Sequence, residues 1–328
     1  MPPASDIFSS FTSLQTSAGR TSEPISLHSL PFGVSGRHRL AKSAVGHAVL
    51  LIETSLPLGA YPAPLKLENL SVQHGYEGRV DPDEMTKISI FTLVEYHVTE
   101  AELVAAFLRL AAHLLDSLKP MPEPRVVALE LRKLIHIFQS LKQPPAKTIQ
   151  GLWAELFVLA KSPSISQWAA AWHDDPMDRY DFAIQRLRVE VKSSGNRTRR
   201  HTFSHEQLHP PRGISLWIAS IFVERSNAGS DCIELLRRIQ ASVSADTAFK
   251  AESIVMCILG SGFLKASDYK FDEFLADESL EFIPINDVPR LMEDLPVGIS
   301  SLRYCVDVPV ASPSNGDTRL HIKLEATK

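Results

Sequence analysis

The chain has 328 residues, 44% hydrophobic and 22% charged, which indicates an ordinary folded protein that is longer than one average domain. Its formal net charge of −4 at pH 7 argues against a protein that coats nucleic acid nonspecifically. Three widely spaced cysteines without metal-ligand spacing, and no run of about 18 uncharged apolar residues, predict a cytoplasmic protein with reduced thiols and no membrane span.

The N-terminal part of the chain divides into three predicted regions. Residues 1–29 are rich in Ser and Thr and lack the basic start and apolar core of a secretory signal, so we expect a mobile tail. Residues 30–98 contain apolar, β-branched runs bounded by Pro, Gly and Asp, which predict a β-rich domain. Residues 99–145 begin with a capping box and are interrupted by prolines, which predicts a helical connector.

Residues 146–270 are predicted to form the functional core, and this core opens with an apolar helix. Leu152, Leu156 and Leu159 fall on one helical stripe, and Glu155 lies in the middle of it. A buried carboxylate is costly unless it is paired or bound to a metal. Glu155 is therefore either a functional residue or one half of an ordinary buried ion pair.

Two short strands that follow this helix carry further ionisable side chains. Asp181 lies on the first strand, and Glu190 and Lys192 lie on the second, where alternation places both on one face. A Glu-x-Lys triplet alone is expected by chance, so its weight comes from this setting. Two carboxylates and an ammonium at a strand edge suit Mg²⁺ and an attacking water, because Mg²⁺ prefers oxygen ligands.

The remainder of the chain predicts a sheet covered by helices. Residues 213–223 form a strongly apolar run typical of a buried strand, and residues 231–242 and 247–259 have helical patterns. This alternation predicts a mixed sheet between helices. Residues 271–328 are expected to form a C-terminal extension with one strand at 300–308 and a polar tail.

Several of these motifs together resemble the PD-(D/E)XK nuclease superfamily, and more narrowly the bacterial PD-(D/E)XK motif proteins encoded with restriction and phage-defence genes. The motifs lie at residues 151–156, 181–182, 190–193 and 204–208. The resemblance covers residues 146–225 and departs from the superfamily pattern at Tyr180, which stands where a dispensable proline is usual. It implies an α/β fold, α+β overall, with a restriction-endonuclease-like core whose mixed central sheet is flanked by helices.

The resemblance also implies an activity, that of a Mg²⁺- or Mn²⁺-dependent endodeoxyribonuclease. Asp181 and Glu190 would bind the metal, and Glu155 would complete the acidic cluster directly or through water. Lys192 would orient the attacking water and offset negative charge as hydroxide forms. The acids and the lysine are all present, which argues against a decayed site.

Other polar residues near these motifs have two interpretations each. Gln207 lies near the metal-site water or the scissile phosphate by resemblance, yet it also fits the third helical position of a capping box. Ser193 either contacts phosphate or is hydrogen-bonded locally. The run containing Arg197, Arg199 and Arg200 predicts a basic loop that would hold the DNA backbone beside the acids, or else a solvated basic turn.

DNA is the predicted partner, and two alternative functions remain open. The first is a nuclease-fold DNA-binding or scaffolding subunit that works only with a defence-system ATPase or methyltransferase. The second is a structure-specific repair or junction nuclease. The chain has no phosphate-binding Gly-rich loop, so it is not expected to hydrolyse ATP. Residues 30–98 lack an acid-lysine constellation and are expected to select the target or dock a partner; a homodimer also remains open.

Overall fold

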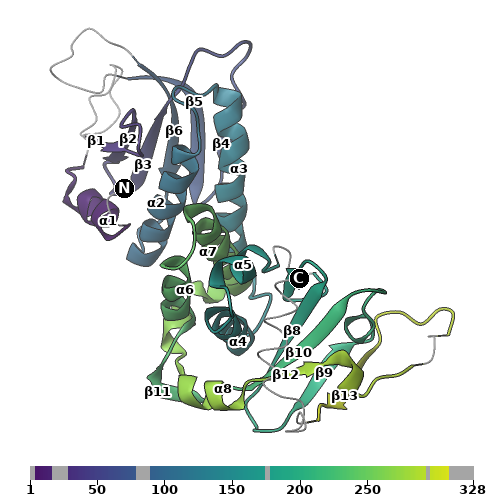
Figure 1. Cartoon of the computed structure of the whole chain (residues 1–328). Helices are drawn as coiled ribbons and strands as arrows, with labels where there is room; N and C mark the ends of the chain where they lie inside the picture. Colours follow the sequence, from purple (N-terminus) through teal and green to yellow (C-terminus); the bar gives the residue numbers. More distant parts are fainter. Residues whose placement is uncertain (1–3, 17–28, 79–88, 174–177, 293–295, 310–328) are drawn as a thin grey trace. The chain divides into compact units, whose positions relative to one another are not determined.

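The computed structural model describes residues 4–16, 29–78, 89–173, 178–292 and 296–309. These residues form two compact units, Met1–Gln139 and Ser140–Lys328 (Figure 1). The division falls at the end of a long helix, a few residues before the predicted start of the core at residue 146. Each unit has its own sheet and is described by itself.

The first unit is built on a six-stranded antiparallel sheet with the order β1-β2-β3-β6-β5-β4. Its strands are β1 (Ser29–Phe32), β2 (His38–Lys42), β3 (Ala48–Glu53), β4 (Leu65–Lys66), β5 (Leu70–Gly78) and β6 (Ser89–Tyr96). Its helices are α1 (Ala4–Ser13), α2 (Ala101–Asp116) and α3 (Pro124–Ser140). The described residues between 30 and 98 therefore lie mainly in strands, and residues 79–88 lie outside the described ones.

Aromatic contacts join the helices of this unit to its sheet. The ring of Tyr96 on β6 stacks on Phe107 of α2 at 4.5 Å and meets Phe138 of α3 at 4.8 Å. Helices α2 and α3 thus share a core with the sheet instead of forming the separate connector predicted for residues 99–145. Helix α1 lies against α2 and buries Phe11, so this stretch of the predicted tail is packed; residues 17–28 lie outside the described ones.

The second unit contains a four-stranded sheet with the order β12-β10-β8-β7, in which β8 and β10 are parallel and the other pairs antiparallel. Its helices are α4 (Ile149–Ala160), α5 (Ile165–Ala170), α6 (Cys232–Gln240), α7 (Ala245–Leu259) and α8 (Glu273–Ser279), with short 3₁₀ turns η1 (Glu206–Leu208), η2 (Gly260–Asp268) and η3 (Ile285–Asp287). Its strands are β7 (Phe182–Ile184), β8 (Leu187–Ser194), β9 (Arg200–Ser204), β10 (Ser215–Phe222), β11 (Arg225–Ser230), β12 (Glu281–Pro284) and β13 (Arg303–Asp307).

Different structures cover the two faces of this mixed sheet. On one face Val189 and Val191 belong to a core that includes Trp153 of α4 and residues of α5, α6 and α7. On the other face Ile218 packs with Phe203 in a smaller core formed with β9 and β13. The predicted mixed sheet and α+β class are confirmed, but in the described residues a β9–β13 ribbon covers the second face where a helix was expected.

The segment predicted as a C-terminal extension is built into the second unit. Strand β12 pairs antiparallel with β10, and β13, which matches the strand predicted at 300–308, pairs with β9. These pairings occupy backbone groups that would otherwise leave β9 and β10 as open edges. The core therefore continues to residue 309, and the polar tail from residue 310 lies outside the described residues.

One helical stretch is long and apolar enough to cross a membrane. Helix α7 continues into η2, so Ala245–Asp268 runs for 24 residues with a mean hydropathy of 1.3 in its best window. No other stretch of the described residues meets that test. Four apolar residues of this stretch are buried in the core beside α4: Ile254, Val255, Ile258 and Leu259. Composition alone cannot distinguish such a buried core helix from a membrane span.

Candidate active site

Helix α4 carries Glu155 into the interior of the second unit. The helix starts at Thr148, whose side-chain oxygen accepts a hydrogen bond from the Gly151 amide at 3.1 Å. This cap fixes the first turn, and the apolar residues that follow are buried. Glu155 lies among them and is only 3% exposed, so the sequence argument for a buried carboxylate is borne out.

The β7–β8 hairpin brings Asp181 beside Glu190. Phe182 pairs with Val189, which places Asp181, the preceding residue, opposite Glu190. The Val191 amide donates to Asp181 Oδ2 at 2.7 Å and fixes that carboxylate against β8. Both acids are about 5% exposed or less. The carboxylate that directly precedes β7 and the carboxylate of Glu190 on β8 thus meet in a buried setting.

Lys192 lies next to Glu190 on the same face of β8. Its Nζ is 2.8 Å from Glu190 Oε1 and 5.0 Å from the centre of the Phe203 ring on β9. The alternation of side chains along β8 requires this placement, since the intervening Val191 points to the opposite core. The ammonium is therefore held at the acidic site by a carboxylate and an aromatic face.

Gln207 makes the hydrogen bonds of the capping-box interpretation and also contacts one of the acids, while its place beside a metal-site water or phosphate stays a prediction. Its backbone amide donates to Ser204 Oγ at 3.2 Å, and its Oε1 accepts from the Ser204 amide at 3.0 Å, which is a capping box. Its Nε2 then donates to Glu190 Oε1 at 2.7 Å. The cap thus positions an amide group against one of the acids.

Lys147 is a site residue that the motifs did not reveal. Its Nζ donates to Glu155 Oε1 at 2.6 Å and to Asp181 Oδ1 at 2.7 Å, so the ammonium lies between the two carboxylates. The residue precedes the Thr148 cap and belongs to no periodic pattern. The one sequence signal was indirect: a buried Glu155 requires a nearby cation.

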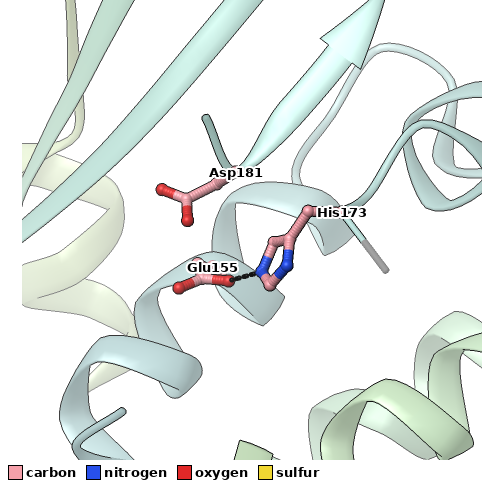
Figure 2. Close-up of side chains that lie close together, drawn as sticks. All are labelled: Glu155, His173 and Asp181. Carbon is pink, nitrogen blue, oxygen red and sulfur yellow. Dashed lines mark hydrogen bonds and ion pairs between the residues drawn. The ribbon is translucent and has the colours of Figure 1, made fainter. Parts of the chain in front are cut away.

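His173 is the second residue that sequence reasoning missed. Its Nε2 lies 3.2 Å from Glu155 Oε2, and the neighbouring Trp172 donates to the same oxygen at 3.1 Å. Glu155, His173 and Asp181 each offer a ligand atom, and these atoms lie within 4.8 Å of one another (Figure 2). His173 reaches this position because its amide donates to the Asp181 carbonyl at 3.1 Å.

The pKa values of the acids show that the site concentrates negative charge. Burial and the charge of Glu155 raise the pKa of Asp181, while burial and the charge of Asp181 raise the pKa of Glu190 to about 8. Burial would also raise the pKa of Glu155, but His173 and Lys147 outweigh it and lower that pKa. A buried cluster of carboxylates with an imidazole is a donor set that fits a divalent cation.

Two of the predicted DNA-contacting residues are engaged inside the protein. Arg199 has a side chain only 7% exposed; it donates to the Ser220 carbonyl at 2.7 Å and lies 3.2 Å from Glu281. Ser193 accepts a hydrogen bond from Gln150 of α4 at 3.2 Å. These contacts favour a structural role for Arg199 and the local interpretation for Ser193.

The other two predicted contacts are exposed to solvent. Arg197 has a side chain 63% exposed and makes two hydrogen bonds to Glu224, one of them from Nη2 at 2.9 Å. Arg200 is 68% exposed and lies 3.9 Å from Asp307, itself 84% exposed. Both guanidinium groups are accessible to an anionic ligand, so their assignment to DNA stays a prediction.

The mixed sheet with its buried acids and adjoining lysine is consistent with a PD-(D/E)XK-like fold. The chain belongs to the family described as "Putative PD-(D/E)XK family member" (DUF4420), whose model matches residues 56–309. No curated protein and no solved structure matches the chain. The family match confirms the predicted superfamily, and it extends well beyond the motif-bearing residues 146–225 into the first unit.

Proposed function

We propose that this protein is a Mg²⁺- or Mn²⁺-dependent endodeoxyribonuclease that hydrolyses DNA phosphodiester bonds, in a restriction or anti-phage defence system. The observation that carries the proposal is the meeting of Glu155, Asp181 and Glu190 with Lys192 in one buried cluster. Membership of the family supports the nuclease class. The defence setting is supported by the resemblance of the sequence motifs.

The carboxylates and the imidazole are the groups that would hold the metal. Asp181 and Glu190 come from paired strands, and Glu155 and His173 approach Asp181 from the helix side. A divalent ion held by these residues would supply charge neutralisation at the phosphate and would lower the pKa of the attacking water. Because imidazole is a poorer ligand for Mg²⁺ than for transition ions, His173 favours Mn²⁺ as the better activator.

Lys192 and Gln207 act on the strand side of the cluster. The Lys192 ammonium is held beside Glu190, where it can orient the attacking water and offset negative charge as that water loses a proton. Gln207 donates to Glu190 Oε1 and so positions this carboxylate. Lys192 would thus act on the attacking water, and Gln207 would act through the position of the Glu190 carboxylate.

Contacts with the DNA backbone are assigned to the exposed arginines. The net charge of −4 gives the protein no general attraction for DNA, so local basic groups are needed. Arg197 and Arg200 are exposed and lie on the segment that follows β8. They would hold phosphates next to the carboxylates, whereas Arg199 supports the fold.

Plasmid cleavage tests this proposal directly. Supercoiled plasmid is incubated with purified protein and Mg²⁺, Mn²⁺ or EDTA, using wild type, Asp181→Ala and Lys192→Ala. We expect metal-dependent nicking that both substitutions abolish, while Lys133→Ala and Lys161→Ala, at exposed ion pairs, leave it intact. Nicking that survives Asp181→Ala and Lys192→Ala would remove these residues from the mechanism. Nicking only after addition of a co-encoded ATPase or methyltransferase would favour the partner-dependent alternative.

A further inference from the structure

We propose that Lys147 is an internal competitor for the metal, whose ammonium occupies the position between Glu155 and Asp181 and must leave before a divalent cation can bind there. The inference rests on the proposed function of the site as a metal centre. Lys147 would restrict the binding of a metal ion at this site. The inference follows from the contacts that Lys147 makes with the two carboxylates.

The two oxygens of the Glu155 carboxylate have different partners. Its Oε2 accepts from the Trp172 indole at 3.1 Å and lies 3.2 Å from His173 Nε2. Its Oε1 accepts from Lys147 at 2.6 Å. A cation approaching Glu155 at Oε1 therefore meets the lysine ammonium first.

The Asp181 carboxylate is divided in the same way. Its Oδ2 accepts from the Val191 amide at 2.7 Å, and its Oδ1 accepts from Lys147 at 2.7 Å. One oxygen of Glu155 and one oxygen of Asp181 thus bind the same ammonium. A single cation bridges the two acids, and that cation is the lysine side chain.

A metal ion and the ammonium cannot share this position. Mg²⁺ lies at about 2.0–2.1 Å from its oxygen ligands, so an ion bridging the same two oxygens would overlap the space of Lys147 Nζ. The two groups also carry charge of the same sign in a buried setting, where repulsion is poorly screened. Binding of one therefore excludes the other.

The Lys147 side chain can leave although its backbone is fixed. The Ala146 amide donates to the Ile258 carbonyl at 2.9 Å, and Thr148 caps α4, so the chain is held on both sides of the lysine. The side chain is 26% exposed and has a flexible four-carbon stem, which gives it a route to solvent.

Mn²⁺ titration in the absence of DNA tests this competition. Isothermal titration calorimetry is performed on wild type, on Lys147→Met, which keeps the stem and removes the charge, and on Lys161→Met. Lys161 is the matched control because it follows the same helix and pairs with the partly exposed Asp277. We expect Mn²⁺ to bind Lys147→Met about tenfold more tightly or better and Lys161→Met as wild type. Equal or weaker binding by folded Lys147→Met would overturn the inference.

Two further variants keep the test decisive. Lys147→Gln offers a neutral hydrogen-bond donor to the acids if Lys147→Met does not fold, and the same tightening is expected. Adding Asp181→Asn to either variant should remove the tight binding; if it does not, the metal binds elsewhere and the inference fails. If plasmid nicking by wild type needs Asp181 but the Lys147 variants bind Mn²⁺ no more tightly than wild type, the competitor role is rejected and the proposed function stands. Absence of both Mn²⁺ binding and nicking rejects both.

Discussion

On the helix side of the site Lys147 lies between Glu155 and Asp181, whereas on the strand side Lys192 contacts Glu190. The two lysines make similar contacts but differ in what surrounds them. Lys147 bridges two acids through oxygens that a metal would use. Lys192 pairs with one acid, Glu190, whose Oε1 also accepts a hydrogen bond from the Gln207 amide. The comparison indicates that similar ion pairs can have opposite functions, since one occupies the cation position and the other lies beside it.

The three carboxylates of the site face two ammonium groups, so a negative charge is left over. This excess is consistent with the raised pKa values of Asp181 and Glu190. A divalent cation bound there would turn this excess into a net positive charge, and release of one lysine would bring the site to neutrality.

The largest effect is expected at the strand-side lysine. Lys192→Met should lower the rate of plasmid nicking at saturating Mn²⁺ by about 10²–10⁴-fold, because the ammonium acts on the attacking water. Mn²⁺ should still bind this variant, which calorimetry would show. Single-turnover rates for Lys192→Met and the control Lys161→Met provide the measurement. A rate within a fewfold of wild type would place Lys192 outside the chemistry.

The next effect concerns the stability that the helix-side pair provides. Glu155→Gln should lower the free energy of unfolding of the metal-free protein, because Lys147 loses one carboxylate. The loss should stay below the roughly 3–5 kcal/mol of a stranded buried charge, since Lys147 keeps Asp181 and reaches solvent. Urea unfolding with EDTA measures it. An unchanged or higher stability would show that the ion pair contributes nothing in the metal-free protein.

A smaller effect is expected from the pH dependence of Glu190. Its pKa in the folded protein is about 8, above its ordinary value of 4.5, so the folded state binds more protons between these values. This group therefore stabilises the fold fully below pH 4.5 and loses that contribution as pH rises through 8. Melting temperatures with EDTA should fall less steeply over this range in Glu190→Gln than in wild type. Equal slopes would contradict the raised pKa.

The smallest effect should separate the exposed and buried arginines. Arg200→Gln should weaken DNA binding across sequences and reduce the salt dependence by about one unit of slope, as expected for one phosphate contact. Arg199→Gln should instead lower the melting temperature, because its buried guanidinium holds Ser220 and Glu281. Fluorescence anisotropy at several salt concentrations and thermal melts provide the two readouts. A lost salt slope in Arg199→Gln without destabilisation would reverse the assignment.

The sequence predicted those residues of the candidate site that lie within a periodic pattern of apolar side chains. Glu155 was found because it interrupts a helical stripe, and Glu190 and Lys192 because strand alternation puts them on one face. The same patterns predicted β10 and the helices α6 and α7. Local periodicity is enough for these features, because burial of one face decides both the element and the direction of its side chains.

The remaining parts depend on contacts between distant segments. Lys147 reaches the acids because the chain before α4 is fixed to Ile258, over a hundred residues away, and His173 because its amide meets the Asp181 carbonyl. No local pattern records either contact. The C-terminal boundary was misplaced for the same reason: the pairing of β13 with β9 joins residues about a hundred positions apart. Likewise, the sequence of α2 and α3 predicted a connector, because the packing of Tyr96 against both helices is a contact that no local pattern records.

The most direct test of the account is a crystal structure with Mn²⁺, using the anomalous signal to locate the ion. We expect an anomalous peak among the carboxylates of Glu155, Asp181 and Glu190. Lys147 should be turned away from the acids, and Lys192 should still lie beside Glu190. A peak elsewhere in the molecule, with the Lys147 ammonium still between Glu155 and Asp181 at saturating Mn²⁺, would contradict it.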